Sequence, residues 1–257
     1  MDFNRIINLS TELGTLMLEN GAETFRVEET MSRICHAYGI TKVDVFVIPT
    51  NIIITIKTNK DDALSRTKRV TNRTINLDKI SKLNNLSREI GFGNLSIENA
   101  EKELRNIFLE KEYSLHIKII GFLVTASSFT LLFGGNFKDA IISGIIGIVL
   151  CLISFFLGIF KTNNFFVNIL SGALATLLAI ISVNFNLASN FNEIVIGSLM
   201  PLVPGLAITN SLRDIIAGDL VAGSAKLIEA FLIAVGIAIG SASILAILIN
   251  TYGGGLI

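Results

Sequence analysis

Apolar residues recur at helical or alternating spacing through the first 112 residues of the chain. In residues 3–19 they lie three or four positions apart, which is typical of an amphipathic helix. Two runs rich in β-branched residues, joined at Pro49, are typical of a hairpin. These patterns predict helices at 3–19, 22–38, 77–90 and 97–112 and strands at 43–48, 52–58 and 65–70. Because the last helix meets no glycine or proline before Tyr113, we expect it to run directly into the membrane as one rod.

Long apolar runs replace this pattern after residue 113. Five of them are near the roughly 20 residues that cross a bilayer as a helix. They span 115–133, 140–160, 165–183, 194–208 with a continuation toward 216, and 221–249. We therefore expect an α-helical polytopic membrane protein with about five transmembrane helices, preceded by a small cytosolic α+β domain. The cytosolic domain is placed at residues 1–112, and the transmembrane domain, with a broken fourth helix, at residues 113–257.

Composition and charge agree with this division. Hydrophobic residues make up 51% of the 257 and charged residues 16%, and the mean hydropathy is +0.65. Residues 1–113 hold 16 of the 21 Lys and Arg and 16 of the 21 Asp and Glu, so no basic excess favours nucleic-acid binding. The N-terminal residues lack the apolar core of a signal peptide. Basic residues beside the spans favour a multi-pass protein of the cell membrane with a cytosolic N-terminus and an external C-terminus.

The fourth apolar run contains two prolines, Pro201 and Pro204, followed by Gly205. Each proline lacks an amide donor, so the carbonyls of Gly197 and Met200 are expected to lose their helical partners. Freed backbone groups are tolerated at membrane depth where they are buried in protein or line a polar cavity. Such a break is typical of transporter substrate sites, and amides after Pro204 would bind a carboxylate. The alternative is a packing kink, since proline and glycine are common in membrane helices.

Polar residues gather at the cytosolic end of this run and at the start of the fifth. They are Asn210, Arg213, Asp214, Asp219, Lys226 and Glu229. Charges inside a membrane are costly and often mark ion pathways, so these side chains suggest an inner gate or a proton relay. Asp214, Asp219 or Glu229 would carry a coupling proton, while Arg213 or Lys226 would bind a second carboxylate of a dicarboxylate substrate.

The N-terminal half contains a second polar group, Glu23, Arg26 and Glu28. Glu23 and Arg26 are three residues apart, a spacing that is typical of a solvated surface pair on a helix. Cys35 and Cys151 fall in different halves and are expected to be buried thiols rather than a disulfide. No nucleophile elbow, phosphate-binding loop or metal signature is present, so we expect no catalytic residues, metal or cofactor.

Four segments resemble the threonine/serine exporter family across nearly the whole chain. They are NGAETFRVEETMSRICHAYG at 20–39, VFVIPTNIIITI at 45–56, LFGGNFKDA at 132–140 and LMPLVPGLAITNSLRDIIAGDLVAG at 199–223. The resemblance implies export of threonine and serine driven by the proton-motive force. Single-chain members have two membrane halves, so one half here resembles the split, two-component YjjP/YjjB type, which is also associated with succinate export. The family's N-terminal domain has been suspected of hydrolysis at positions matching Glu23, Arg26 and Glu28, where we see no catalytic arrangement.

Three classes of function are compatible with these features. The first is a subunit of a secondary exporter of small hydrophilic metabolites, with threonine and serine or a dicarboxylate such as succinate as substrate. With an odd number of spans, a second half of the same kind would lie in the membrane in the opposite orientation, as in the inverted repeats of many transporters. We therefore expect a second, smaller membrane subunit or a homo-oligomer. The second is a membrane-anchored cytosolic enzyme or sensor, which would not require a doubly broken helix. The third is a channel, for which no filter motif is visible.

Overall fold

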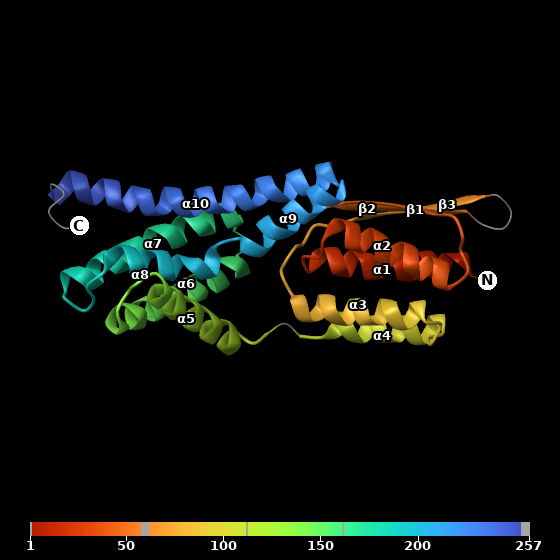
Figure 1. Ribbon diagram of the computed structural model, residues 1–257, viewed down its shortest axis with the longest axis horizontal. Coiled ribbons are helices and arrows are strands. Elements are labelled where there is room, and N and C mark those ends of the chain that lie inside the picture. Colours follow the sequence, from red (N-terminus) through yellow and green to blue (C-terminus); the bar gives the residue numbers. More distant parts are fainter. Residues whose placement is uncertain (1, 58–61, 112, 161, 253–257) are drawn as a thin grey trace. The chain divides into compact units, whose positions relative to one another are not determined.

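Figure 1 shows the computed structural model of the chain, which describes residues 2–57, 62–111, 113–160 and 162–252. The chain divides into two compact units. The first unit consists of Met1–Lys111 and Leu206–Ile228, and the second of Glu112–Gly205 and Glu229–Ile257. The segment Leu206–Ile228 therefore packs with the N-terminal residues, although its sequence lies between apolar spans.

The first unit is built in layers around a three-stranded antiparallel sheet (Figure 1). Its strands, in the order β1-β2-β3, are β1 (Val43–Ile48), β2 (Asn51–Lys57) and β3 (Ala63–Arg69). Four helices complete the N-terminal part: α1 (Phe3–Glu19), α2 (Thr24–Ala37), α3 (Leu77–Gly91) and α4 (Ile97–Leu109). The helices α1 and α2 cover one face of the sheet, and α3 and α4 pack against them in turn.

The core of the first unit follows the predicted apolar pattern. Ile52, Ile54 and Ile56 alternate along β2, are fully buried, and face the helix layer. From α1 and α2, side chains such as Leu13 and Met31 complete this core. All seven predicted elements are present, with ends within three residues of expectation, because alternation and helical spacing are local properties of the chain.

The expected rod from α4 into the first apolar span is wrong. The helix α4 ends at Leu109, and Glu110 adopts an extended conformation with φ −59° and ψ 129°. The next helix starts at Leu115, after Ser114 in an extended N-cap conformation. The Ser114 side chain makes no cap hydrogen bond, but the Glu110 carboxylate pairs with Lys82 of α3 at 2.7 Å at the end of α4. A helix can thus end without glycine or proline, which is why the absence of a breaker misled the prediction.

The second unit is a bundle of apolar helices. They are α5 (Leu115–Leu132), α6 (Phe137–Ile159), α7 (Asn164–Asn184), α8 (Phe191–Leu199), the short 3₁₀ turn η1 (Met200–Leu202) and the later part of α10 (Leu220–Tyr252). Among the described residues, four helices are long and apolar enough to cross a membrane. The number is five if the broken pair Phe191–Leu202 and Gly205–Ala217 counts as one span, as the sequence predicted.

Small residues let α7 and α10 approach closely within this unit. A Cβ atom built at Gly172 would lie 3.1 Å from the carbonyl carbon of Ile237, and one at Gly240 would lie 2.8 Å from the amide of Ala173. The GxxxG step at Gly236 and Gly240 therefore makes a close helix contact, as expected for small residues in membrane helices.

Candidate functional site

The helix α1 ends in a glycine turn that presents two carbonyl groups. Gly21 has φ +92°, and the amides of Gly21 and Ala22 donate into the last turn of α1 at 3.2 and 3.0 Å. This is the Schellman pattern of a helix C-terminus. The helix α2 then starts at Thr24, and its N-cap residue, Glu23, provides no side-chain cap. The first turn of α2 therefore needs an acceptor from another part of the chain.

The helix α9 (Gly205–Ala217) ends in the same kind of turn. Gly218 has φ +103°, and the amides of Gly218 and Asp219 donate into the last turn of α9 at 3.1 and 2.9 Å. The helix α10 then starts so close to α9 that a Cβ atom at Gly223 would lie 2.7 Å from a carbonyl oxygen of α9. This close return brings Lys226 to Asp214, with Nζ and Oδ2 2.8 Å apart.

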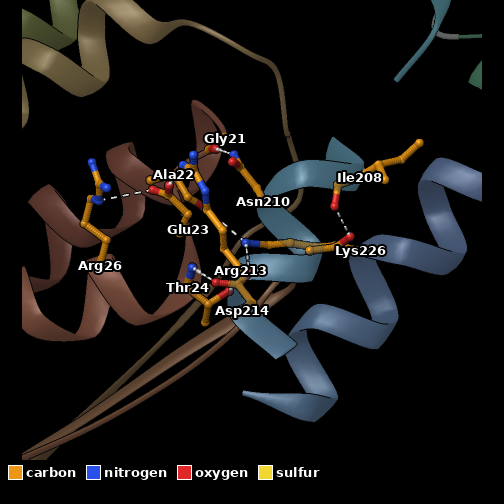
Figure 2. Close-up of polar contacts among 11 residues, drawn as sticks. Gly21, Ala22, Glu23, Thr24, Arg26, Ile208, Asn210, Arg213, Asp214 and Lys226 are labelled. Carbon is orange, nitrogen blue, oxygen red and sulfur yellow. Dashed lines mark hydrogen bonds and ion pairs between the residues drawn. The ribbon is translucent and has the colours of Figure 1, made fainter. Parts of the chain in front are cut away.

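Asp214 supplies the missing acceptor for α2 (Figure 2). Its Oδ1 accepts the backbone N–H of Thr24 at 2.8 Å, and its Oδ2 accepts the Thr24 hydroxyl at 3.1 Å and the Lys226 ammonium at 2.8 Å. The side chain of Asp214 is fully buried, and that of Lys226 is 15% exposed. A carboxylate at a helix N-terminus is favourable, and removing one partner of a buried ion pair costs about 3–5 kcal/mol.

Two further contacts hold the turn between α1 and α2. The Lys226 ammonium also donates to the carbonyl of Ala22 at 3.1 Å, and the Asn210 side-chain amide donates to the carbonyl of Gly21 at 3.0 Å. We call these contacts the α2–α9 joint. It comprises Gly21, Ala22, Glu23, Thr24 and Arg26 on one side and Asn210, Arg213, Asp214 and Lys226 on the other. The joint unites two groups of polar residues that the sequence had placed in separate domains.

Glu23 forms the outer part of the joint (Figure 2). Its carboxylate accepts from Arg213 at 2.9 Å and from Arg26 at 3.1 Å. The side chain of Glu23 is only 7% exposed, whereas those of Arg213 and Arg26 are 57% and 41% exposed. The expectation of a solvated surface pair is therefore wrong for Glu23, because α9 covers a residue that would face solvent on an isolated helix.

Glu28 and Asp219 border the joint and share its electrostatics. The Oε1 atom of Glu28 accepts the amide of Val47, on β1, at 2.7 Å. Burial raises the pKa of Glu28, the Val47 amide lowers it, and the nearby Asp219 and Asp214 carboxylates raise it. The predicted cytosolic group of Glu23, Arg26 and Glu28 thus belongs to one charged region with Asp214. Among the described residues, no group of His, Cys, Asp and Glu is arranged to hold a metal ion.

The proline turn lies in the second unit and breaks the helix as expected. The helix α8 ends at Leu199, η1 follows, and α9 starts at Gly205 directly after Pro204. The expectation of freed carbonyls is wrong. The Gly197 carbonyl accepts the amide of Met200, and the Met200 carbonyl accepts the amide of Val203 at 3.2 Å. A 3₁₀ turn replaces the lost donors, because the residue before each proline can still donate.

Gly197 serves a close contact between helices. A Cβ atom at this position would lie 2.7 Å from the amide of Thr130 and 2.9 Å from the carbonyl oxygen of Ala126, both on α5. Glu229, in contrast, lines a cavity of about 350 Å³ together with Leu232 and Ile233 of α10 and Thr162, Asn163, Asn164 and Phe165 at the start of α7. None of the residues predicted around the proline turn lines this cavity.

Sequence reasoning missed two polar residues that the structure makes central. Thr24 provides both donors of α2 to Asp214, and nothing in its local sequence indicates a partner 190 residues away. Asp139, at the start of α6, is fully buried and accepts from the amides of Asn136, Ser189 and Asn190 at 2.9, 2.7 and 3.2 Å. Its capping box with Asn136 is a local signal that would have revealed part of this role.

Known proteins match the chain along most of its length. The sequence pattern of the family described as "Putative threonine/serine exporter" matches residues 8–248. The threonine/serine exporter of Corynebacterium glutamicum is 27% identical over 244 residues, covering 91% of this chain and 50% of the relative. The probable threonine/serine exporter of Mycobacterium tuberculosis is 21% identical over 238 residues, covering 92% and 45%.

A more distant similarity extends to a fungal protein. Pheromone-regulated membrane protein 10 of Pichia sorbitophila is 25% identical over 238 residues, covering 86% of this chain and 23% of the relative. No solved structure matches the chain. The chain spans about half the length of the two bacterial exporters. Because the family pattern covers nearly all of its residues, the chain belongs to the threonine/serine exporter family.

Proposed function

We propose that this chain is one membrane half of a secondary exporter of threonine and serine, driven by the proton-motive force. Family membership and the apolar helices support transport across a membrane. The distribution of Lys and Arg beside the spans favours a cytosolic N-terminus and an external C-terminus. In this arrangement, residues 1–112 form a cytosolic domain, and residues 113–257 form the transmembrane domain.

The observation that carries this proposal is the buried Asp214–Lys226 pair bound to the first turn of α2. Membrane helices that merely anchor an enzyme or sensor have no need to bury their own charges against a helix of the N-terminal residues. Here, α9 and α10 bury charges against α2. Removing either partner of this pair costs about 3–5 kcal/mol, so a substitution in α9 or α10 affects the first turn of α2 as well. This coupling favours an integrated transporter subunit over a membrane-anchored enzyme or sensor.

The proline turn is the substrate site in this proposal. The first-turn amides of α9, after Pro204 and Gly205, bind the substrate carboxylate at the positive end of the helix. Asn210, Arg213, Asp214 and Lys226 serve the joint instead of contacting substrate.

A second membrane half completes the transport unit. The two bacterial exporters are about twice the length that this chain matches. A five-span half would be joined by a half of opposite orientation, which is the inverted-repeat arrangement of many transporters. We assign this second half to a smaller membrane subunit or to a second copy of the chain.

Proteoliposomes that contain the chain with its second half test this proposal. Labelled threonine, serine and succinate are compared with and without a pH gradient. Threonine and serine flux that requires the gradient supports the proposal, succinate flux alone moves the assignment to dicarboxylates, and no flux of any of them refutes an exporter. Pro204→Ala allows an α-helical amide to replace the 3₁₀ donor of Val203 at the Met200 carbonyl and should abolish flux, whereas Pro49→Ala, in the β1–β2 turn, should not.

A further inference from the structure

Asp219 connects α9 to α10 and carries a buried oxygen atom whose hydrogen-bonding capacity is unused. Its amide donates to the carbonyl of Asp214 at 2.9 Å, and its carbonyl accepts from Gly223 at 2.9 Å, so both helices fix its backbone. Its Oδ2 atom is buried and has no hydrogen-bond partner among the described residues. A buried carboxylate oxygen without a donor is costly, so the structure must compensate for it in another way.

Among the described residues, none of the neighbouring charged side chains donates a hydrogen bond to the Oδ2 atom of Asp219. From α10, Lys226 already contacts Asp214 at 2.8 Å and the carbonyl of Ala22 at 3.1 Å. On α2, the Glu28 carboxylate accepts a hydrogen bond from the backbone amide of Val47 on β1. In the rest of the joint, Arg26 and Arg213 both pair with the Glu23 carboxylate. Glu28, Asp214 and Asp219 therefore bring three carboxylates into one charged region, in which Lys226 pairs with Asp214.

These surroundings favour a neutral Asp219. Burial is the main cause that raises its pKa, the Asp214 carboxylate raises it further, and Lys226 lowers it in part. Asp219 in turn helps to raise the pKa of Glu28, after the larger effect of burial. Asp214 differs, because its two carboxylate oxygens accept hydrogen bonds from three donors. The two aspartates, five residues apart, thus have opposite hydrogen-bonding environments.

We propose that Asp219 is the proton-binding residue of the α2–α9 joint. One proton from water binds the buried oxygen atom of Asp219 when the joint is closed and returns to water when the joint opens. No other bond forms or breaks. This inference deepens the proposed function, on which it rests for the direction of proton flow, by naming the group that couples protonation to the contact between α2 and α9.

Protonation strengthens the closed joint. A neutral Asp219 does not repel Asp214 or Glu28, whereas an ionised one does. Because the pKa of Asp219 is higher in the closed joint than in an open, solvated one, the closed joint binds the proton more tightly. Raising the pH through the interval between these two pKa values therefore weakens the joint, by about tenfold in its closing equilibrium for each unit that separates them.

Hydrogen exchange in the first turn of α2 measures closure of the joint, since the Thr24 amide donates to Asp214. The full chain in lipid nanodiscs is compared over a pH series, with rates corrected for intrinsic exchange. The wild type should lose protection as the pH rises, and Asp219→Asn should remove this pH dependence. Asp44→Asn, an exposed aspartate on β1, should behave as the wild type. An unchanged pH dependence in Asp219→Asn overturns the proposal.

A second variant and a direct spectroscopic measurement guard against a folding defect. Glu28→Gln removes a repelling charge and should move the midpoint of the wild-type transition to lower pH; a shift to higher pH contradicts the proposal. Infrared difference spectra of the wild type should show a protonated carboxyl band that titrates across the same interval and is absent in Asp219→Asn. If the band persists in that variant, the proton is held elsewhere.

These measurements need no substrate, so they separate this inference from the proposed function. If the wild type transports nothing but shows the Asp219 band, the exporter proposal fails and the proton site stands. If gradient-driven flux occurs without the band, the proton site alone fails. When both hold, Asp219→Asn should keep exchange of threonine for threonine and lose flux driven by the pH gradient.

Discussion

Replacing Asp214 with asparagine is expected to open the joint. The Asn side chain keeps one acceptor for the Thr24 amide, but its NH₂ group would face the Thr24 hydroxyl and the Lys226 ammonium, both of which are donors in the wild type. Lys226, with a side chain only 15% exposed, would lose its carboxylate and keep only the carbonyl of Ala22. The substitution changes few atoms, so its effect reports on charge rather than on packing.

The magnitude follows from the burial of the pair. Removing one partner of a buried pair costs about 3–5 kcal/mol, and the remaining exposure of Lys226 places this case near 3 kcal/mol. A change of about 3 kcal/mol corresponds to opening on the order of a hundredfold more often. Adding Lys226→Met removes the unpaired buried ammonium, which is the main cost of the single substitution. The double variant should therefore recover most of the loss.

Hydrogen exchange of the peptide that contains Thr24 is a suitable assay, because it reports local opening in the full chain. Asp214→Asn should accelerate this exchange on the order of a hundredfold, and Asp44→Asn should not. If Asp214→Asn changes the rate by less than about twofold, or if Lys226→Met fails to restore it, the Asp214–Lys226 pair does not hold the joint.

Three further substitutions or reactions test the fold around the site. Gly21→Ala should destabilise the protein more than Gly93→Ala in thermal unfolding. Both glycines have positive φ, which costs an L-residue about 1–2 kcal/mol. Of these two positions, only Gly21 has a neighbour that a Cβ atom would meet, the Thr74 carbonyl at 3.2 Å. Gly240→Ala should lower the thermal stability in lipid, whereas Gly158→Ala, with open space around it, should not. Cys35 is buried, which raises the pKa of its thiol to about 11, so alkylation at neutral pH should be slow until denaturant is added.

Local patterns predicted the elements well and their polar contacts poorly. The alternation of Ile52, Ile54 and Ile56 predicted both a strand and its buried face, since these depend only on neighbouring residues. The break at Pro201 and Pro204 was equally local. The hydrogen bonds of the Gly197 and Met200 carbonyls were not predictable in the same way. The turn η1 provides amide donors that a uniform helix with these prolines would lack.

The joint was beyond prediction from spacing alone. Asp214 and Thr24 are 190 residues apart, and neither residue type indicates its partner. The sequence did show that charges interrupt an apolar run at Arg213 and Asp214, and that Gly21 separates two helices near Glu23. Each signal marked one side of the contact. Only the packing of Leu206–Ile228 with the N-terminal residues brings the two sides together.

Two fully buried aspartates show why the joint, rather than the helix bundle, is suited to switching. Asp139 accepts hydrogen bonds from backbone amides and from the side chain of Asn190, all of them neutral donors within one unit. None of those donors carries a charge. Asp214 instead depends on the Lys226 ammonium and lies beside Asp219 and Glu28, two carboxylates with raised pKa values. With the proposed protonation of Asp219, a single proton alters the free energy of the joint.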